Sequence, residues 1–116
     1  MSRLDRLDRL ARWGPVVVWA AVIFALSSVP SLSTGLGTWD LLLRKAAHVV
    51  EFALLGALLA RALPSLGWAI VLGSLYAVSD EVHQVFVPGR VGSPLDWALD
   101  TAGVVAGALA WTRLAR

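Results

Sequence analysis

Four long apolar stretches, separated by short connectors that contain helix breakers, follow one another along the chain. They cover about residues 10–28, 41–63, 66–87 and 95–112, with Pro and Gly residues between them. Each stretch has about the 20 residues that an α-helix needs to cross a bilayer. The pattern predicts an all-α integral membrane protein, in which four transmembrane helices form an up-down antiparallel bundle and a single domain covers residues 1–116.

The first twelve residues show a different pattern, in which Arg and Asp recur around Leu. Asp5 and Arg9, like Asp8 and Arg12, lie four residues apart with the acid first. This order favours ion pairing on a helix. We expect a short amphipathic helix on the cytoplasmic membrane surface, ahead of the first transmembrane helix. Pro15 then falls in the first turns of that transmembrane helix, where its missing N–H is tolerated.

The composition agrees with a membrane protein and excludes several other classes. The chain is 58% hydrophobic and 16% charged, and it has six Trp residues, which suit bilayer interfaces. Its mean hydropathy is +0.72. The net charge of +2 is too small to indicate nucleic-acid binding. Because there is no Cys, disulfides and thiolate chemistry are excluded. We therefore expect membrane lipids as partners and no nucleic acid.

Basic residues are divided unequally between the two ends of the predicted bundle. Seven of them fall on the side of the two termini: Arg3, Arg6, Arg9, Arg12, Arg61, Arg113 and Arg116. The opposite side has Arg44, Lys45 and Arg90. Cytoplasmic loops carry the excess of basic residues in membrane proteins. We therefore expect a multi-pass protein with both termini in the cytoplasm and with the loops at residues 29–40 and 88–94 facing outward.

Most other ionisable residues fall in the outer loops or in the outer halves of the helices. With the three basic residues already assigned to the outer side, eleven ionisable residues lie there: Asp40, Arg44, Lys45, His48, Glu51, Asp80, Glu81, His83, Arg90, Asp96 and Asp100. A charge at the bilayer centre costs about 2.5–3.5 kcal/mol on insertion scales, so such residues usually line a protein interior or a wet cavity. This placement predicts a polar site at the outer end of the bundle.

Helical phase favours one shared cavity for these residues. The faces that would line it are Arg44, His48 and Glu51 on the second helix, Tyr76, Asp80, His83 and Gln84 on the third, and Asp96, Asp100, Gly103 and Gly107 on the fourth. The same phase makes Glu81 point elsewhere. The spacing Gly103-x-x-x-Gly107 lets a neighbouring helix approach closely. We therefore expect a funnel that opens outward and is closed below by helix packing.

Several of these residues also have a purely structural interpretation. Asp40 is placed to cap the N-terminus of the second helix, and the run from Ser93 to Asp96 resembles a cap followed by an acid in the first turn. Arg44 and Lys45 can reach the lipid headgroups by extending their side chains. A purely structural charge cluster therefore remains one of the alternatives.

Two segments carry a resemblance to a known family. The first runs from Arg44-Lys45 through His48 and Glu51-Phe52 to Gly56, and the second from Tyr76 through Asp80-Glu81, Gln84 and Pro88-Gly89-Arg90 to Gly107. Together they resemble the VanZ-like family of small membrane proteins, in which Asn is usual where this chain has Asp100. The resemblance implies a protein of the bacterial cytoplasmic membrane and cell envelope that is linked to resistance to the glycopeptide teicoplanin.

One hypothesis is a binding protein for an anionic envelope lipid, a lipid-linked cell-wall precursor or a glycopeptide-type ligand. Arg44, Lys45 and Arg90 would pair with phosphate or carboxylate groups. The other ligand-binding residues expected are Gln84, Asp96 and Asp100. A homo-oligomer is also compatible with the sequence.

The alternative hypothesis is an intramembrane hydrolase or transferase that acts on a lipid-linked cell-wall component. His48, Glu51, Asp80 and Glu81 supply the residue types for acid–base catalysis. In a metal-dependent variant, His48-x-x-Glu51 and Asp80-x-x-His83 would hold a divalent ion such as Zn²⁺. Transport is a third class, but no ionisable residue is expected in the inner half of the core. The sequence leaves open whether any reaction is catalysed.

Overall fold

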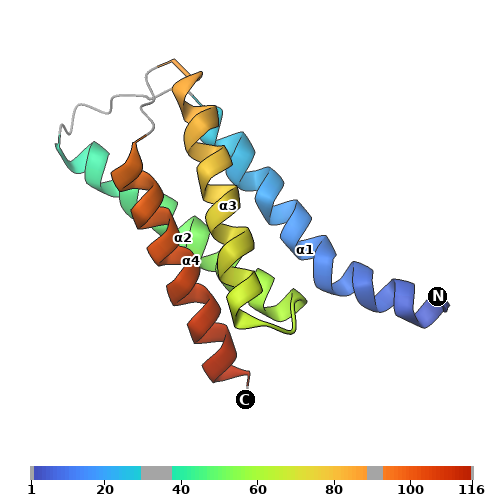
Figure 1. The fold of residues 1–116 in the computed structure, drawn as a ribbon. Helices are drawn as coiled ribbons and strands as arrows, with labels where there is room; N and C mark the ends of the chain where they lie inside the picture. The colour runs from blue at the N-terminus through green and yellow to red at the C-terminus, as the bar shows by residue number, and fades with distance from the viewer. Residues whose placement is uncertain (1, 30–37, 89–92, 116) are drawn as a thin grey trace.

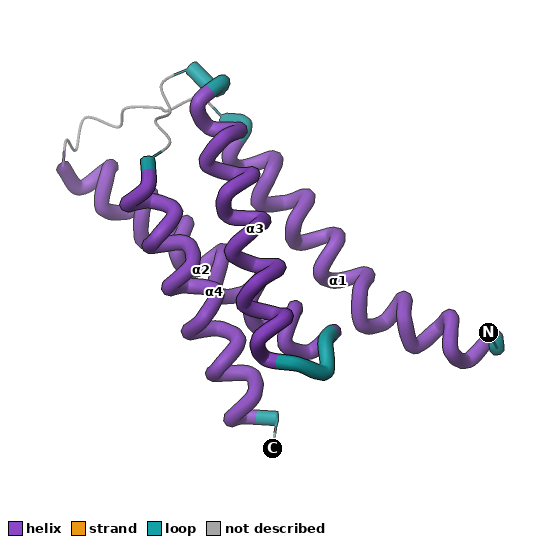
Figure 2. The backbone as a smooth tube through the Cα atoms, in the orientation of Figure 1, coloured by secondary structure: helices purple, strands orange, loops and turns teal. Residues whose placement is uncertain are grey.

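The computed structural model describes residues 2–29, 38–88 and 93–115, and all regular structure in these ranges is helical. The four helices are α1 (Arg3–Ser27), α2 (Thr38–Ala62), α3 (Leu66–Val85) and α4 (Pro94–Leu114). Figures 1 and 2 show α2, α3 and α4 packed together, with α1 lying beside α3 and its first turns running away from the bundle. The prediction of an all-α chain with four long helices is therefore confirmed.

α1 differs from the prediction because the expected surface helix and the first long helix are one continuous helix. It begins with a capping box, in which Ser2 Oγ accepts from the Asp5 N–H and the Asp5 carboxylate accepts from the Ser2 N–H. Pro15 lies inside the helix and has no N–H to donate to the Ala11 carbonyl, four residues earlier. Instead, that carbonyl accepts a 2.9 Å hydrogen bond from Arg61 Nη1 of α2. This contact satisfies the acceptor that proline leaves open.

The second helix also begins earlier than expected. α2 starts at Thr38, so that Asp40 lies within its first turn and does not occupy the N-cap position that the sequence suggested. The cap predicted for α4 is confirmed, since Ser93 Oγ accepts from the Asp96 N–H at 3.1 Å and Pro94 is the first helical residue.

Glycines bring α2 and α4 into close contact. A Cβ at Gly107 would lie 1.7 Å from the Ala53 carbonyl oxygen, and one at Gly103 would lie 2.6 Å from the Val49 carbonyl oxygen. Both distances are shorter than real Cβ contacts, so only glycine allows this approach. The predicted role of the Gly103-x-x-x-Gly107 spacing is confirmed, and the helix that approaches is α2.

Two side-chain hydrogen bonds attach α1 to the rest of the bundle. Trp19 Nε1 donates to the Glu51 carbonyl of α2 at 2.8 Å. The Tyr76 hydroxyl of α3 donates to the Ala20 carbonyl of α1. Both bonds lie next to the buried apolar core, which consists of Val16, Ile23, Phe52, Leu55, Leu59, Ala62, Ala69, Ala77 and Val104. They fix α1 beside the part of α2 and α3 that carries the polar residues.

Around the apolar core, the surface of the bundle is inverted relative to that of a soluble protein, because large apolar side chains are exposed and several carboxylates are buried. Leu75 is 60% exposed and Val82 is 55% exposed, whereas Asp80 is 3% exposed and Asp100 is 1% exposed. Among the described helices, α1 is the one that is long and apolar enough to cross a membrane by hydropathy alone. The charged residues of α1 all lie in its first ten residues, whereas α2, α3 and α4 carry charged residues within their apolar stretches or at both ends of them. Four membrane crossings therefore stay a prediction.

Candidate functional site

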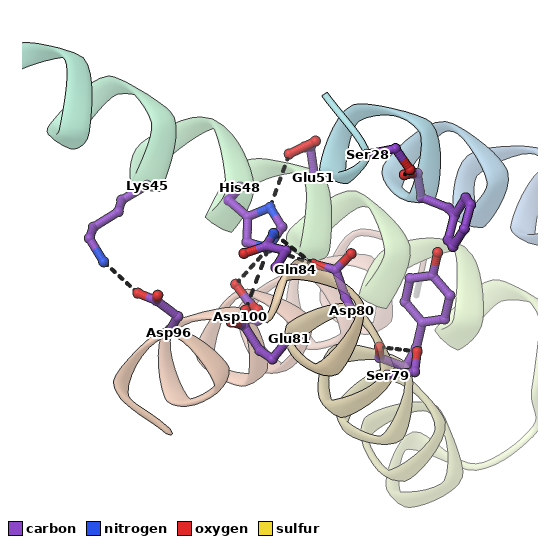
Figure 3. A network of polar contacts seen from close by, with 12 residues as sticks. Ser28, Lys45, His48, Glu51, Ser79, Asp80, Glu81, Gln84, Asp96 and Asp100 are labelled. Carbon is purple, nitrogen blue, oxygen red and sulfur yellow. Dashed lines mark hydrogen bonds and ion pairs between the residues drawn. The ribbon is translucent and has the colours of Figure 1, made fainter. Parts of the chain in front are cut away.

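His48 lies at the centre of a group of carboxylates that come from three helices (Figure 3). Its Nε2 is 3.0 Å from Asp80 Oδ2, 3.3 Å from Asp100 Oδ1 and 3.8 Å from Glu81 Oε1. Its Nδ1 is 3.4 Å from Glu51 Oε2, one turn later on α2. We call His48, Asp80, Glu81 and Asp100 the His48 cluster. It unites three of the four residues predicted for catalysis with Asp100, which was predicted for ligand binding, and the fourth, Glu51, lies against its edge.

The carboxylates of the His48 cluster are buried. The Asp80, Glu81 and Asp100 side chains are 1%, 9% and 2% exposed, and the His48 side chain is 16% exposed. Several of their atoms have no hydrogen-bond partner among the described residues, namely His48 Nε2, Asp80 Oδ1, Glu81 Oε1 and Asp100 Oδ2. Most buried polar atoms in proteins are hydrogen-bonded, so this concentration of unpartnered atoms requires an explanation.

Close helix packing brings the cluster together. Asp100 lies one turn before Gly103, and His48 adjoins Val49, the residue whose carbonyl meets Gly103. The glycine contact between α2 and α4 therefore also places Asp100 against His48. Helical phase alone had made Glu81 point away from the site, which is wrong. α3 contacts both α2 and α4, so side chains on two adjacent faces of α3 reach the same cluster.

Polar contacts outside the cluster hold two of its carboxylates. Gln84 Nε2 donates to Asp80 Oδ2 at 3.3 Å, which accounts for Gln84 as a neighbour of the site. The Ser93 N–H donates to Glu81 Oε2 at 3.4 Å. Both contacts leave the unpartnered oxygens of the two carboxylates available. The orientation of the carboxylates is therefore set by α3 itself and by the start of α4.

The predicted anion-binding residues do not all lie together. Lys45 forms a salt bridge with Asp96 beside the cluster, so its charge is already matched (Figure 3). Arg44 is exposed and lines a cavity of about 240 Å³. Arg90 lies outside the described residues. Of the two predicted cationic residues in the described part of the chain, Arg44 lines this cavity.

The cavity lies between α1 and α2, next to the cluster. Its lining is formed by Leu26, Ser27, Val29, Arg44, Ala47, His48 and Glu51. Apart from the Ser27 hydroxyl the wall is apolar on the α1 side, and it is polar where α2 presents Arg44, His48 and Glu51. Helical phase assigned no residue of the first helix to the site, although Ser27-Ser28 at its end is similar to the VanZ-like family at that position. The Ser27 hydroxyl at the end of α1 is buried and has no hydrogen-bond partner among the described residues. This unpartnered hydroxyl indicates that the end of α1 belongs to the site.

His83 lies apart from the His48 cluster. Its ring stacks on Phe24 of α1 with ring centroids 4.2 Å apart, and its Nε2 is 3.3 Å from Ser28 Oγ. Among residues 2–29, 38–88 and 93–115, the four donors that converge closely enough for one metal ion are His48, Asp80, Glu81 and Asp100, whose ligand atoms all lie within 4.8 Å of one another. The possible metal ligands therefore include Glu81 and Asp100 in place of Glu51 and His83, which the sequence suggested.

Comparison with known proteins defines the class to which the chain belongs. The VanZ/LLP1 family model matches residues 10–115, nearly the whole chain, and the chain therefore belongs to the VanZ-like family. Membership of this family suggests a cell-envelope protein related to teicoplanin resistance. No curated protein and no solved structure matches the chain. Membership of the family defines the class of the protein, but it does not define the chemistry of the site.

Proposed function

We propose that this protein is a multi-pass membrane protein of the bacterial cell envelope that binds the anionic group of an envelope lipid at the outer end of its bundle. The observation that carries the proposal is the cavity beside His48, which has an apolar wall on α1 and Arg44, His48 and Glu51 on α2. A lipid-linked cell-wall precursor presents the same combination of phosphate and apolar chain. A glycopeptide-type ligand such as teicoplanin has anionic and apolar groups as well.

The inverted surface supports insertion of all four helices in the membrane. The large apolar side chains of α3 face outward, while Asp80 and Glu81 on the same helix are buried. The 20 residues of α3 extend over about 30 Å, which matches the hydrocarbon thickness of a bilayer. Charged residues in membrane helices usually face the bundle interior, as they do here. The excess of Arg residues near both termini supports a cytoplasmic position for both ends.

The size and chemistry of the cavity favour a headgroup over a whole lipid. At about 240 Å³ it is smaller than the roughly 300–1,000 Å³ of sites that enclose drug-sized ligands. A guanidinium has five N–H donors in a planar fork, which suits two-point contact with a phosphate. In the proposed complex Arg44 holds the phosphate, and the acyl or polyprenyl chain leaves past Leu26 and Val29 toward the membrane.

A lipid-binding measurement on matched arginine variants tests this function. The protein is purified in detergent, and binding of phosphatidylglycerol and phosphatidylcholine is compared by native mass spectrometry for the wild type, Arg44→Gln and Arg113→Gln. Arg113 is exposed in the last turn of α4, at the other end of the bundle, so its substitution is the matched charge control. We expect selective binding of the anionic lipid that Arg44→Gln reduces and Arg113→Gln retains. Equal losses in both variants would show that the cavity is not the binding site.

The second candidate is an enzyme that acts on a lipid-linked cell-wall component, and one observation favours it. The His48 ring lies between Glu51 on its Nδ1 side and Asp80 and Asp100 on its Nε2 side. A carboxylate that orients one ring nitrogen prepares the other for proton transfer. Incubation with a labelled lipid-linked disaccharide measures product release. An enzyme would release product in the wild type but not in His48→Gln, whereas binding without release in both would leave the first candidate.

A further inference from the structure

We propose that His48 Nε2 and the carboxylates of Asp80, Glu81 and Asp100 bind a divalent transition-metal ion, Zn²⁺ or Mn²⁺. The proposal concerns the side of His48 that faces α3 and α4. It does not depend on what occupies the cavity, which lies on the side of α2 that faces α1. Four observations support it: the spacing of the donor atoms, their missing hydrogen bonds, the buried charge, and the residues that orient them.

The spacing of the donor atoms suits a single ion. His48 Nε2 lies 3.0, 3.3 and 3.8 Å from one oxygen of Asp80, Asp100 and Glu81. Ligands at about 2.0–2.2 Å from a tetrahedral ion are roughly 3.3–3.6 Å apart, and neighbouring ligands of an octahedral ion are about 3 Å apart. The observed separations fall around these values, so one ion fits between the four donors with small side-chain adjustments.

The directions of the donor groups also indicate a ligand. Although His48 Nε2 is within 3.5 Å of two carboxylate oxygens, it has no partner in hydrogen-bonding geometry among the described residues. Glu81 Oε1, which faces the ring nitrogen, is also buried without a partner. Hydrogen bonds would pair the nitrogen with one oxygen. A common central ion instead attracts all of these atoms without requiring N–H alignment between them.

The buried charge of the cluster requires compensation. Within the described parts of the chain, the ion pairs of Asp80, Glu81 and Asp100 involve His48 and no Lys or Arg side chain. The neighbouring Lys45 pairs with Asp96. Leaving three carboxylates buried with one imidazole is costly. A divalent cation would balance the negative charge that the described residues leave at the point where the carboxylates meet.

Residues around the donors orient them as they do in known metal sites. A histidine ligand usually has its second ring nitrogen held by a carboxylate or carbonyl, and here Glu51 Oε2 is 3.4 Å from His48 Nδ1. Gln84 Nε2 donates to the Asp80 oxygen that faces His48, and the Ser93 N–H donates to the second oxygen of Glu81. A set of one imidazole and three carboxylates contains no soft sulfur ligand, which favours Zn²⁺ or Mn²⁺ over Cu⁺.

Metal uptake by the purified protein tests the proposal. The protein is stripped with EDTA in detergent, and ZnCl₂ or MnCl₂ is titrated by calorimetry, with the bound metal quantified by elemental analysis after dialysis. We expect about one ion per chain in the wild type. Glu51→Gln, which removes an orienting contact, is expected to lose about 10–100-fold in affinity, and Asp100→Asn is expected to lose more.

Asp8→Asn is the matched control because Asp8 is an exposed carboxylate of α1 that pairs with Arg12 and lies outside the His48 cluster. It should retain the wild-type affinity. Wild-type uptake no greater than that of Asp100→Asn would overturn the proposal. Should Asp100→Asn not fold, X-ray absorption of the wild-type metal complex decides: an imidazole and several oxygens support the site, whereas oxygen alone overturns it.

Discussion

Substitution of Gly107 by alanine tests directly whether the contact between α2 and α4 builds the site. The added Cβ would lie 1.7 Å from the Ala53 carbonyl oxygen, whereas real Cβ atoms essentially never approach closer than 3.0 Å. The Cβ would therefore be 1.3 Å too close to the oxygen. Because the oxygen belongs to the backbone and cannot rotate away, the two helices must separate by about this amount. The Nε2–Oδ1 distance of 3.3 Å between His48 and Asp100 would then grow to about 4.6 Å if both helices move as rigid rods.

The separation should affect stability and binding together. Inserting a methyl group into a well-packed contact typically costs about 1–3 kcal/mol. For a chain of this length that corresponds to a fall in unfolding temperature of roughly 4 °C per kcal/mol. Unfolding can be followed by the intrinsic fluorescence of the six Trp residues. Thiol-reactive dyes are not an option because the chain has no Cys. Metal and lipid binding are measured on the same preparation at a temperature where the variant is folded.

Gly67→Ala is the matched control for this prediction. Its Cβ would meet Ser65 Oγ at 3.6 Å, an ordinary contact, so the unfolding temperature should be unchanged or slightly higher, because alanine is the better helix former. The reasoning fails if Gly107→Ala unfolds at the wild-type temperature. A variant that is destabilised but retains full metal and lipid affinity would also contradict the claim that this contact positions Asp100 against His48.

The hydrogen bonds that hold α1 lead to further predictions. Arg61→Gln should lower the unfolding free energy by about 1 kcal/mol in the wild type, because the Ala11 carbonyl loses its donor. In a Pro15→Ala background the restored N–H fills that role, so fluorescence melting should show a smaller effect of Arg61→Gln, and equal effects would disprove the link. Tyr76→Phe removes the bond to the Ala20 carbonyl and should cost about 0.5–1.5 kcal/mol in the same assay without changing metal uptake. A loss of metal stoichiometry in this variant would show that α1 also positions the His48 cluster.

The sequence was sufficient to predict features that depend on neighbouring residues or on one helix. The number of helices follows from the apolar stretches, and the cap at Ser93 follows from the run Ser93-Pro94-Leu95-Asp96. The grouping of His48, Asp80 and Asp100 follows from helical phase together with the observation that all three lie toward the same end. The glycine spacing on α4 predicted a close contact, although not its partner.

Features that depend on a distant residue were not predictable in the same way. The expected surface helix and the first long helix form one helix, and Arg61 donates to its Ala11 carbonyl from 50 residues further along the chain. Helical phase assigns side chains to a face of their own helix, but it does not indicate which helices cover that face. For this reason Glu81 was expected to point away from the site, and the position of His83 against Phe24 of α1 was not foreseen.

The most direct test of the proposed function is whether a lipid phosphate lies beside His48 in a membrane. The chain has two His residues, so His83→Gln leaves His48 as the only histidine that carries a ¹³C,¹⁵N label. In liposomes of phosphatidylglycerol, solid-state NMR measures dephasing of the ring signal by ³¹P. The half-buried His48 ring lines the cavity, so our account predicts dephasing that Arg44→Gln removes and Arg113→Gln retains. A His48 signal that is unaffected by ³¹P in the protein with both arginines intact would contradict the proposed function.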